Sequence, residues 1–292
     1  MPPPETTNPL NVFTITGIYS IIITCTFFLH FFIAKGYSMS TKPLADKRVI
    51  ITGASTGIGA GIAHEFAKAG AHIWGAGGSD LQGLQNTIDA CKHLGVNAGG
   101  KCYDLSKAHR TSQLIHDGVD FLRGLDILVV CAGTRAFKPI VEITDDEVDL
   151  LFEVNAKAAY IASREAAKVM IPQKSGSILM IGSSAGHRGR ADTSLYSVTK
   201  SVLHHLTKCL ALELGSLGIR VNCLAPGLVA SPRVKARLDA KPEYLQSRLE
   251  GIPLHQLGTV ENMATTALFM VSPENEFMNG SIVLSDGGVT AG

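Results

Sequence analysis

Short apolar runs rich in β-branched residues alternate with longer helical patterns from Leu44 to the end of the chain. This alternation predicts βαβ units, and therefore a parallel sheet with helices on both faces, because each helical pattern is long enough for a right-handed crossover. The predicted strands are 48–52, 71–76, 99–104, 126–131, 177–183, 219–225 and 281–285, and the clearest helical patterns are 57–69, 80–94, 107–122, 146–171 and 195–214. Seven strands predict one doubly wound α/β domain of the Rossmann type, which we assign to residues 44–292.

The N-terminal segment 1–43 contains a long run without charged residues. Residues 13–34, "FTITGIYSIIITCTFFLHFFIA", include no Asp, Glu, Lys or Arg. As a helix this run of about 22 residues would be ~33 Å long, which matches the hydrocarbon core of a bilayer. Basic residues follow the run and none precedes it, so we expect a transmembrane anchor with the domain 44–292 on the cytoplasmic face. If translation starts at Met39 instead, we expect a soluble cytoplasmic protein.

Charge and cysteine usage exclude two classes of site. The chain has 26 Lys and Arg against 25 Asp and Glu, and these charges are scattered, so we expect no nucleic-acid partner. The six cysteines have no CxxC or other metal-binding spacing. They are predicted to be reduced thiols in the core, and no metal is expected.

A glycine-rich turn, "TGASTGIG" at 52–59, follows the first predicted strand and opens the first helix. Gly53 allows the chain to leave the strand sharply, Gly57 allows the backbone to approach a pyrophosphate, and Gly59 allows close helix packing. The free N–H groups at the helix N-terminus favour phosphate. A tight loop without a ligand is the alternative, but the position favours NAD or NADP binding. The cofactor-binding residues predicted in this turn are Gly53, Ser55, Thr56, Gly57, Ile58 and Gly59.

The sequence "LYSVTK" places Tyr196 and Lys200 four residues apart at the start of a helical pattern, so both side chains project from one face. A phenol is a weak acid at neutral pH, and a nearby ammonium favours its ionised form by charge attraction. This spacing alone is common on helix surfaces. Here it follows Ser183, which ends the fifth strand in "IGSSAG" and brings a hydroxyl to the same edge of the sheet. These three residues therefore predict an acid–base site.

Together these motifs resemble those of the short-chain dehydrogenase/reductase family, over nearly all of 44–292. The family's TGxxxGxG matches 52–59, its YxxxK matches Tyr196 and Lys200, and "NGSIVLSDGG" is similar to its last strand. The resemblance implies that Tyr196 exchanges a proton with the substrate oxygen while Ser183 hydrogen-bonds that oxygen. It implies that Lys200 supports the tyrosine and holds the nicotinamide ribose, and that Asn155 in "FEVNAKAAY" completes the catalytic tetrad through a water.

The resemblance also implies cofactor contacts outside the glycine turn. Asp104 after the third strand is similar to the acidic residue that contacts adenine, and "VNCLAPGLVASP" is similar to the segment beside the nicotinamide. The residues assigned to the cofactor on this basis are Asp104, Ala132, Gly133, Asn155, Tyr196, Lys200, Pro226, Gly227, Val229 and Ser231.

Two departures from the family pattern concern the sheet and the choice of cofactor. The family's NNAG is here "VCAG", 130–133, so both asparagines are absent and we expect altered local hydrogen bonding in an intact sheet. After the second strand, Gly77 and Gly78 stand where an acidic residue would select NAD or an arginine would select NADP. The sequence therefore predicts NAD or NADP without a preference.

We expect an NAD(P)-dependent oxidoreductase that interconverts a secondary alcohol and a ketone. A catalytically silent dinucleotide-binding scaffold of the same fold is the alternative. A protein that only binds the cofactor, however, does not need a tyrosine whose acidity suits proton transfer. A nucleotide-sugar epimerase is disfavoured by the glycine spacing and the short core. The resemblance implies a homo-oligomer, dimer or tetramer, formed through the helices at 107–122 and 146–171. A membrane anchor favours a lipophilic substrate, and a start at Met39 leaves a soluble oxoacyl, sugar or polyol substrate open.

Some residues near the site have open assignments. The segment 229–254 stands where the family has a mobile substrate lid, and its mixed charge also suits a solvated pair of helices. His187 and Arg188 follow Ser183 and are candidates for the substrate mouth. His204 and His205 are expected to have packing or surface roles.

Overall fold

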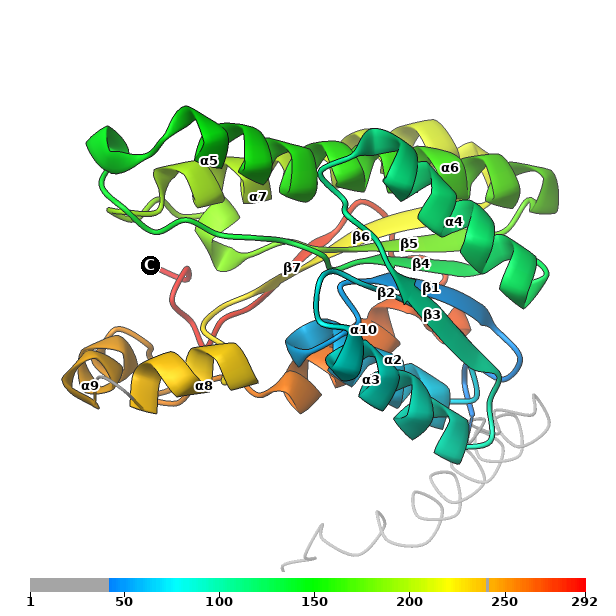
Figure 1. Ribbon diagram of the computed structural model, residues 1–292, viewed down its shortest axis with the longest axis horizontal. Helices are drawn as coiled ribbons and strands as arrows, with labels where there is room; N and C mark the ends of the chain where they lie inside the picture. The colour runs from blue at the N-terminus through cyan, green and yellow to red at the C-terminus, as the bar shows by residue number, and fades with distance from the viewer. Residues whose placement is uncertain (1–41, 240–241) are drawn as a thin grey trace, which may run out of the picture. The chain divides into compact units, whose positions relative to one another are not determined.

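The computed structural model describes residues 42–239 and 242–292, which form a seven-stranded parallel sheet between two layers of helices (Figure 1). The strands are β1 (Arg48–Thr52), β2 (His72–Gly77), β3 (Ala98–Cys102), β4 (Ile127–Val130), β5 (Gly176–Ile181), β6 (Ile219–Pro226) and β7 (Ile282–Ser285). Their order across the sheet is β3-β2-β1-β4-β5-β6-β7. The strand order therefore reverses between β1 and β4, and the predicted fold class is confirmed for this domain.

The helices divide between the two faces of the sheet (Figure 1). One face is covered by α2 (Gly57–Lys68), α3 (Leu81–His93) and α10 (Val260–Val271), and the other by α4 (Ala108–Leu122), α5 (Asp145–Leu151), α6 (Ala158–Gln173) and α7 (Ser194–Leu214). Two further helices, α8 (Pro232–Asp239) and α9 (Pro242–Glu250), follow β6 and lie beyond the carboxyl ends of the strands. The residues that connect strands to helices at these carboxyl ends are the ones that can meet a ligand.

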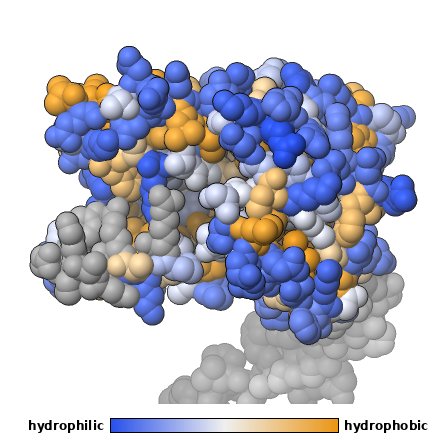
Figure 2. Space-filling model, in the orientation of Figure 1, coloured by the Kyte–Doolittle hydropathy of each residue, from blue (hydrophilic) through white to orange (hydrophobic). Residues whose placement is uncertain are grey.

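The core consists of two layers, one on each face of the sheet. In β1, Val49 and Ile51 pack in the layer that contains Phe66 of α2, while Ile50 packs in the layer that contains Leu114 of α4. All five side chains are fully buried. A strand that is apolar on both faces is typical of a parallel sheet with helices on both sides. The face of the molecule in Figure 2 is accordingly largely hydrophilic, with hydrophobic residues in small separate patches.

The predicted helix 146–171 contains a π-helical turn. Helix α5 ends at Leu151, a π-helical turn occupies Phe152–Lys157, and α6 begins at Ala158. The helix predicted over 146–171 is therefore present, and the π-helical turn within it was not predicted. A π-helical turn contains more residues than an α-helical turn and is often found at functional sites. Asn155 lies within it and is buried.

Some expectations concern residues outside the described ranges. The candidate anchor 13–34 and Cys25 lie outside them. Within 42–239 and 242–292, no helix is both long and apolar enough to span a membrane. The five cysteines of the described residues are free thiols, and Cys91 and Cys223 are buried.

Candidate active site

The glycine turn between β1 and α2 has two glycines in the left-handed region, Gly53 at φ 72° and Gly57 at φ 60°. A Cβ atom at Gly53 would lie 2.8 Å from Cα of Ala132, and one at Gly59 would clash with the carbonyl oxygen of Gly53. Packing alone therefore requires glycine at 53 and 59. At Gly57 the only neighbour among the described residues within 4 Å of such an atom is Cβ of Ser231, at 3.4 Å. The backbone at Gly57 thus borders open space that a ligand can approach.

The N-terminus of α2 has no side-chain cap. Thr56, the N-cap residue, accepts no hydrogen bond through its side chain, and the first turn contains no acidic residue. The first N–H groups of a helix have no partner within the helix, and they carry the positive end of its dipole. The hydroxyl of Ser55 in the same turn is buried and has no hydrogen-bond partner among the described residues. These unpaired donors fit the pyrophosphate of a dinucleotide.

The segment after β6 reaches the glycine turn. Pro226 pairs with Ser285 of β7, and Gly227 follows it and donates its N–H to the carbonyl of Ser285 at 2.9 Å. Val229 is buried and bridges to Gly258, and Ser231 lies beside Gly57. The fold therefore brings two predicted cofactor segments together although they are separated by most of the chain.

The carboxyl end of β4 is braced by the threonine that opens the glycine motif. The hydroxyl of Thr52 accepts the N–H groups of Cys131 and Ala132, both at 3.0 Å. This is the local bonding of a strand end that lacks the family's asparagines. Gly133 follows directly, and a Cβ atom there would lie 3.3 Å from Oδ1 of Asn155 and 3.5 Å from Nζ of Lys200. Gly133, Asn155 and Lys200 are thus direct neighbours.

Asn155 is held by three hydrogen bonds. Its Oδ1 accepts the N–H of Thr134 at 2.7 Å, while its Nδ2 donates to the carbonyl of Thr134 at 2.9 Å and to Oγ1 of Thr199 at 3.0 Å. The Thr199 hydroxyl in turn donates to the main-chain carbonyl of Tyr196 at 2.8 Å. Thr199 is fully buried, and the sequence analysis gave it no role. Its position directly before Lys200 on the face toward the core was the only available signal.

Lys200 is buried beside these residues. Its side chain is 4% exposed, and Nζ donates to the carbonyl of Ile181 at the end of β5, at 2.8 Å. An ammonium has three N–H donors, and this bond uses one. A buried ammonium is costly unless its N–H groups have hydrogen-bond partners. The two N–H groups that this bond does not use can donate to a ligand.

Tyr196 and Ser183 line one cavity of about 350 Å³ at the carboxyl edge of the sheet. The tyrosine ring packs edge-on against Phe137, with 5.4 Å between ring centroids. The Ser183 oxygen accepts the N–H of Ala185 at 3.1 Å, which leaves its O–H proton to donate to a ligand. The structure therefore brings Ser183 and Tyr196 to one hollow, with Lys200 on the same helix as the tyrosine.

The region expected to contact the adenosine contains an exposed carboxylate. The Asp104 carboxylate accepts the N–H and the hydroxyl of Ser106, and these bonds hold the pKa of Asp104 below its usual range. At the end of β2, a Cβ atom on Gly77 would press on the Ser55 hydroxyl, whereas one on Gly78 would meet nothing within 4 Å. Neither glycine offers a group that selects between NAD and NADP.

The histidines after Ser183 differ in their surroundings. His204 is buried, and a Cβ atom on Gly182 would lie 2.6 Å from its Nε2, so its ring packs beneath the Ser183 turn. Burial lowers the pKa of His204, and the neighbouring His187 and Lys200 act in the same direction. His187 is exposed, while Arg188 lines the 350 Å³ cavity.

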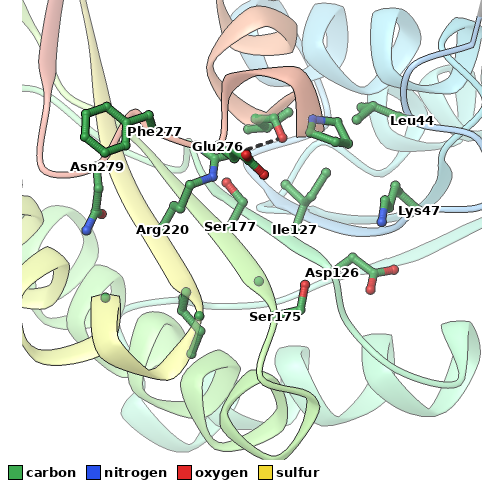
Figure 3. A pocket seen from close by; sticks show the side chains of 16 residues that line it. Leu44, Lys47, Asp126, Ile127, Ser175, Ser177, Arg220, Glu276, Phe277 and Asn279 are labelled. Atoms are coloured by element: carbon green, nitrogen blue, oxygen red, sulfur yellow. Dashed lines mark hydrogen bonds between the residues drawn. The ribbon is translucent and has the colours of Figure 1, made fainter. Parts of the chain in front are cut away.

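A larger cavity of about 480 Å³ lies at the opposite edge of the sheet, where β4, β5 and β6 begin. Figure 3 shows Phe277 and Asn279 on one side of it and Lys47 and Asp126 on the other. In doubly wound sheets, ligands bind beyond the carboxyl ends of the strands. The smaller cavity, which contains Ser183 and Tyr196, is therefore the candidate active site.

Comparison with known proteins agrees with this geometry. A family model described as enoyl-(acyl carrier protein) reductase matches residues 53–290. An uncharacterized oxidoreductase of Thermotoga maritima is 36% identical over 248 residues, covering 84% of this chain and 98% of the relative. L-xylulose reductase of Bos taurus is 34% identical over 249 residues, covering 85% and 98%.

A solved structure extends the comparison to the fold. It is that of a putative NAD(P)-dependent gluconate 5-dehydrogenase from Beutenbergia cavernae with bound NADP at low occupancy. It has a TM-score of 0.81 and 31% identity, and the match covers 87% of this chain and all of that chain. Because sequence, fold and motif geometry agree, the chain belongs to the short-chain dehydrogenase/reductase family and is an NAD(P)-dependent enzyme.

Proposed function

We propose that the protein interconverts a secondary alcohol and a ketone, with Tyr196 as the group that gives or takes the proton at the substrate oxygen. The observation that carries this proposal is that Tyr196 and Ser183 line one cavity at the carboxyl edge of the sheet. Lys200 lies one helical turn from Tyr196 and is buried behind the cavity. A phenol, a hydroxyl and an ammonium in this arrangement suit acid–base catalysis at the oxygen of a substrate alcohol or ketone.

Each of these side chains has a distinct task in the proposal. The Ser183 hydroxyl donates to the substrate oxygen and stabilises the charge that develops there. Lys200 lies one turn further along α7 and supports Tyr196 from the same helix. Asn155 and Thr199 hold the main chain at Tyr196 through their hydrogen bonds. Bound NAD(P) supplies or accepts the hydride.

The proposed cofactor site extends along the carboxyl edge from the β1–α2 turn. Gly57 and the N-terminus of α2 would hold the pyrophosphate, because that helix end has no side-chain cap. Lys200 would hold the nicotinamide ribose. The further residues proposed to line the site are Gly53, Ser55, Thr56, Ile58, Gly59, Asp104, Ala132, Gly133, Asn155, Tyr196, Pro226, Gly227, Val229 and Ser231.

The names of two relatives support a small hydroxylated substrate. L-xylulose reductase and the putative gluconate 5-dehydrogenase are both named for carbon chains with several hydroxyls. Among the substrate classes considered from the sequence, we therefore favour a sugar or polyol derivative over a lipophilic one.

Replacing Tyr196 by phenylalanine tests the reaction. The Tyr196→Phe variant keeps the ring against Phe137 and loses the proton, so turnover of any accepted ketone should fall by at least about 100-fold. Binding of NADH or NADPH, followed by nicotinamide fluorescence, should be retained. Tyr160→Phe is the matched control, because Tyr160 is exposed on α6, away from the cavity. Unchanged turnover in Tyr196→Phe would refute the assignment, and cofactor binding without turnover of any alcohol or ketone by the wild-type chain would favour the silent scaffold.

We also propose that the chain forms homo-oligomers through α4, α5 and α6. Large hydrophobic side chains are exposed on these helices and on the π-helical turn between the last two, namely Phe121, Leu150, Phe152 and Tyr160. Exposed apolar side chains that gather on one part of a surface mark interaction sites. The membrane anchor at 13–34 stands as a separate proposal. Membrane fractionation of cells that express the full chain or a chain starting at Met39 tests it, because only the full chain should sediment with membranes.

A further inference from the structure

His204 is a buried titratable side chain that the proposed reaction does not use. It lies on α7, one turn beyond Lys200 and two turns beyond Tyr196, and it is 8% exposed. Its Nε2 atom is buried and has no hydrogen-bond partner among the described residues. A buried polar atom without a partner costs free energy, and an apolar side chain of similar size would avoid that cost. The stability of the core therefore does not explain a histidine at this position.

The imidazole ring lies against two glycines, one before and one after Ser183. A Cβ atom on Gly182 would lie 2.6 Å from Nε2 of His204, and one on Gly186 would lie 3.0 Å from its Cε1. Neither position has room for a side chain next to the ring. The ring therefore defines where the main chain enters and leaves the turn that carries Ser183.

This turn is closed by its own hydrogen bond and rests directly on α7. The N–H of Gly186 donates to the carbonyl of Ser183 at 2.9 Å, and a Cβ atom on Gly186 would lie 2.8 Å from the carbonyl carbon of Lys200. At the other end of the turn, Nζ of Lys200 donates to the carbonyl of Ile181 at 2.8 Å. Residues 181–186 thus contact α7 at both ends, and the His204 ring lies against a glycine near each end.

The surroundings of His204 keep its ring uncharged at neutral pH. Burial lowers the pKa of His204, and the neighbouring His187 and Lys200 lower it further. The main chain of Ser183 acts in the opposite direction on this pKa, so it lies close to the ring. A neutral ring adds no positive charge beside Lys200. His204 therefore acts on the turn through its shape and its contacts.

We propose that His204 is a positioning residue for Ser183, and that its ring holds the Ser183 hydroxyl in the place from which it reaches the substrate oxygen. This inference rests on the proposed function, in which that hydroxyl donates to the oxygen. A donor that stabilises developing charge is effective when it is held in place before the reaction, and a small displacement lowers the rate strongly. Asn155 and Thr199 hold the main chain at Tyr196, and His204 has the corresponding task at Ser183.

A double-mutant cycle between His204 and Ser183 tests this role in the full chain. The probe is the ketone that the wild-type protein reduces fastest among L-xylulose, cyclohexanone and acetoacetyl-N-acetylcysteamine, with NADPH or NADH. His204→Ala removes the ring and should lower kcat about 10-fold with a smaller change in KM. In the Ser183→Ala background the same substitution should change kcat by less than about 2-fold, because the hydroxyl that the ring positions is already absent.

A second variant and a matched control accompany the cycle. His204→Gln keeps a polar side chain of similar length, and its kcat should lie between those of the wild type and His204→Ala. If His204→Ala does not fold, His204→Gln takes its place in the cycle. His205→Ala is the control, because His205 is the next residue of α7 and is exposed, and its kcat should equal that of the wild type. The Kd for NADPH, followed by nicotinamide fluorescence, should change by less than about 2-fold in each His204 variant, since the ring lies at the Ser183 turn and not at the β1–α2 turn.

The cycle separates a failure of this inference from a failure of the proposed function. A loss of kcat by the same factor in both backgrounds would show a general structural role, and it would overturn the inference while the proposed reaction stands. Wild-type kcat in His204→Ala would overturn it as well. Wild-type kcat in Ser183→Ala would instead refute the proposed role of Ser183, and the inference with it.

Discussion

The amide nitrogen of Asn155 lies 3.0 Å from the hydroxyl oxygen of Thr199, and that hydroxyl lies 2.8 Å from the main-chain carbonyl oxygen of Tyr196. These bonds connect the π-helical turn to the first turn of α7. The Asn155 and Thr199 side chains are at most 1% exposed, so water cannot replace a bond that is lost. The position of the proposed proton donor therefore depends on a threonine that does not line the cavity.

Replacing Thr199 by valine should damage both stability and catalysis. Valine has the shape of threonine without the hydroxyl, so Nδ2 of Asn155 keeps only the Thr134 carbonyl and the Tyr196 carbonyl loses this donor. We expect the free energy of unfolding to fall by about 1–3 kcal/mol, the usual cost of a buried polar group that loses its partner. We expect kcat to fall about 10-fold with a smaller change in KM, because a misplaced reacting group lowers the rate more than binding. Chemical denaturation measures the free energy of unfolding, and steady-state kinetics measures kcat and KM. Thr199→Ser keeps the hydroxyl and should restore most of the stability and most of kcat. A valine variant with wild-type kcat would contradict the positioning role.

Two glycine variants distinguish ligand approach from the cost of an added methyl group. Gly57→Ala adds a Cβ atom at φ 60°, where left-handed backbone costs about 1–2 kcal/mol, and places it in the space proposed for the pyrophosphate. We expect the Kd for NADPH to rise at least about 10-fold, as for an approach that only glycine permits. Gly78→Ala adds the same atom where nothing lies within 4 Å and should leave the fold intact. Fluorescence titration measures both affinities. Equal affinities of the Gly57 variant and the wild type would show that the pyrophosphate does not bind at this turn.

The buried His204 should make the protein less stable in mild acid. Its pKa is lowered from 6.5 by burial first and then by His187 and Lys200, so the native state takes up the proton at lower pH than the unfolded chain does. The unfolded state binds more protons in that interval, and the free energy of unfolding therefore decreases as the pH falls below about 6.5. His204→Gln cannot take up the proton, so its free energy of unfolding should vary less between pH 7.5 and 5. Urea denaturation across this range compares the slopes, and identical slopes for variant and wild type would exclude His204 as the cause.

Oligomerisation can be tested with one charged substitution and a matched control. Tyr160 on α6 is 54% exposed, and Leu81 on α3 is 68% exposed on the other face of the sheet. Tyr160→Glu buries a charge in the proposed interface and should shift the wild-type dimer or tetramer towards smaller species in sedimentation velocity. Leu81→Glu should leave the distribution unchanged. A monomeric wild-type protein would refute the proposed assembly.

The sequence predicts most of the sheet because each buried parallel strand is a continuous apolar run. All seven predicted strands are present, and their ends differ from the structure by two residues at most. The glycine turn and the Tyr196–Lys200 spacing are equally local, since each depends on neighbours within one strand–helix connection. The structure places Ser183, Tyr196 and Gly227 at one cavity and puts Lys200 next to Asn155 and Gly133.

What the sequence does not predict depends on tertiary contacts. Thr199 is an ordinary helix residue by pattern, and its role follows only from Asn155, which is 44 positions away. Arg188, a candidate for the substrate mouth by sequence, lines the cavity, whereas Arg135 and Arg248 come from separate segments that only the fold brings to the same hollow. The π-helical turn inside the helix predicted at 146–171 has no signal in hydrophobic periodicity, which locates a helix but not one extra residue within it.

The π-helical turn at 152–157 also limits insertions and deletions in this part of the chain. A π-helical turn contains about one residue more than an α-helical turn, so α6 is rotated by roughly 100° from the direction that α5 alone would give it. This change of helical phase lets Asn155 face Thr199 while the alanines of α6 at 159, 162 and 166 remain packed in the core layer on that face of the sheet. Deleting one residue between 152 and 157 would restore an uninterrupted helix and force one of those two faces out of position. The number of residues in this segment is thus constrained as strictly as the identity of the asparagine within it.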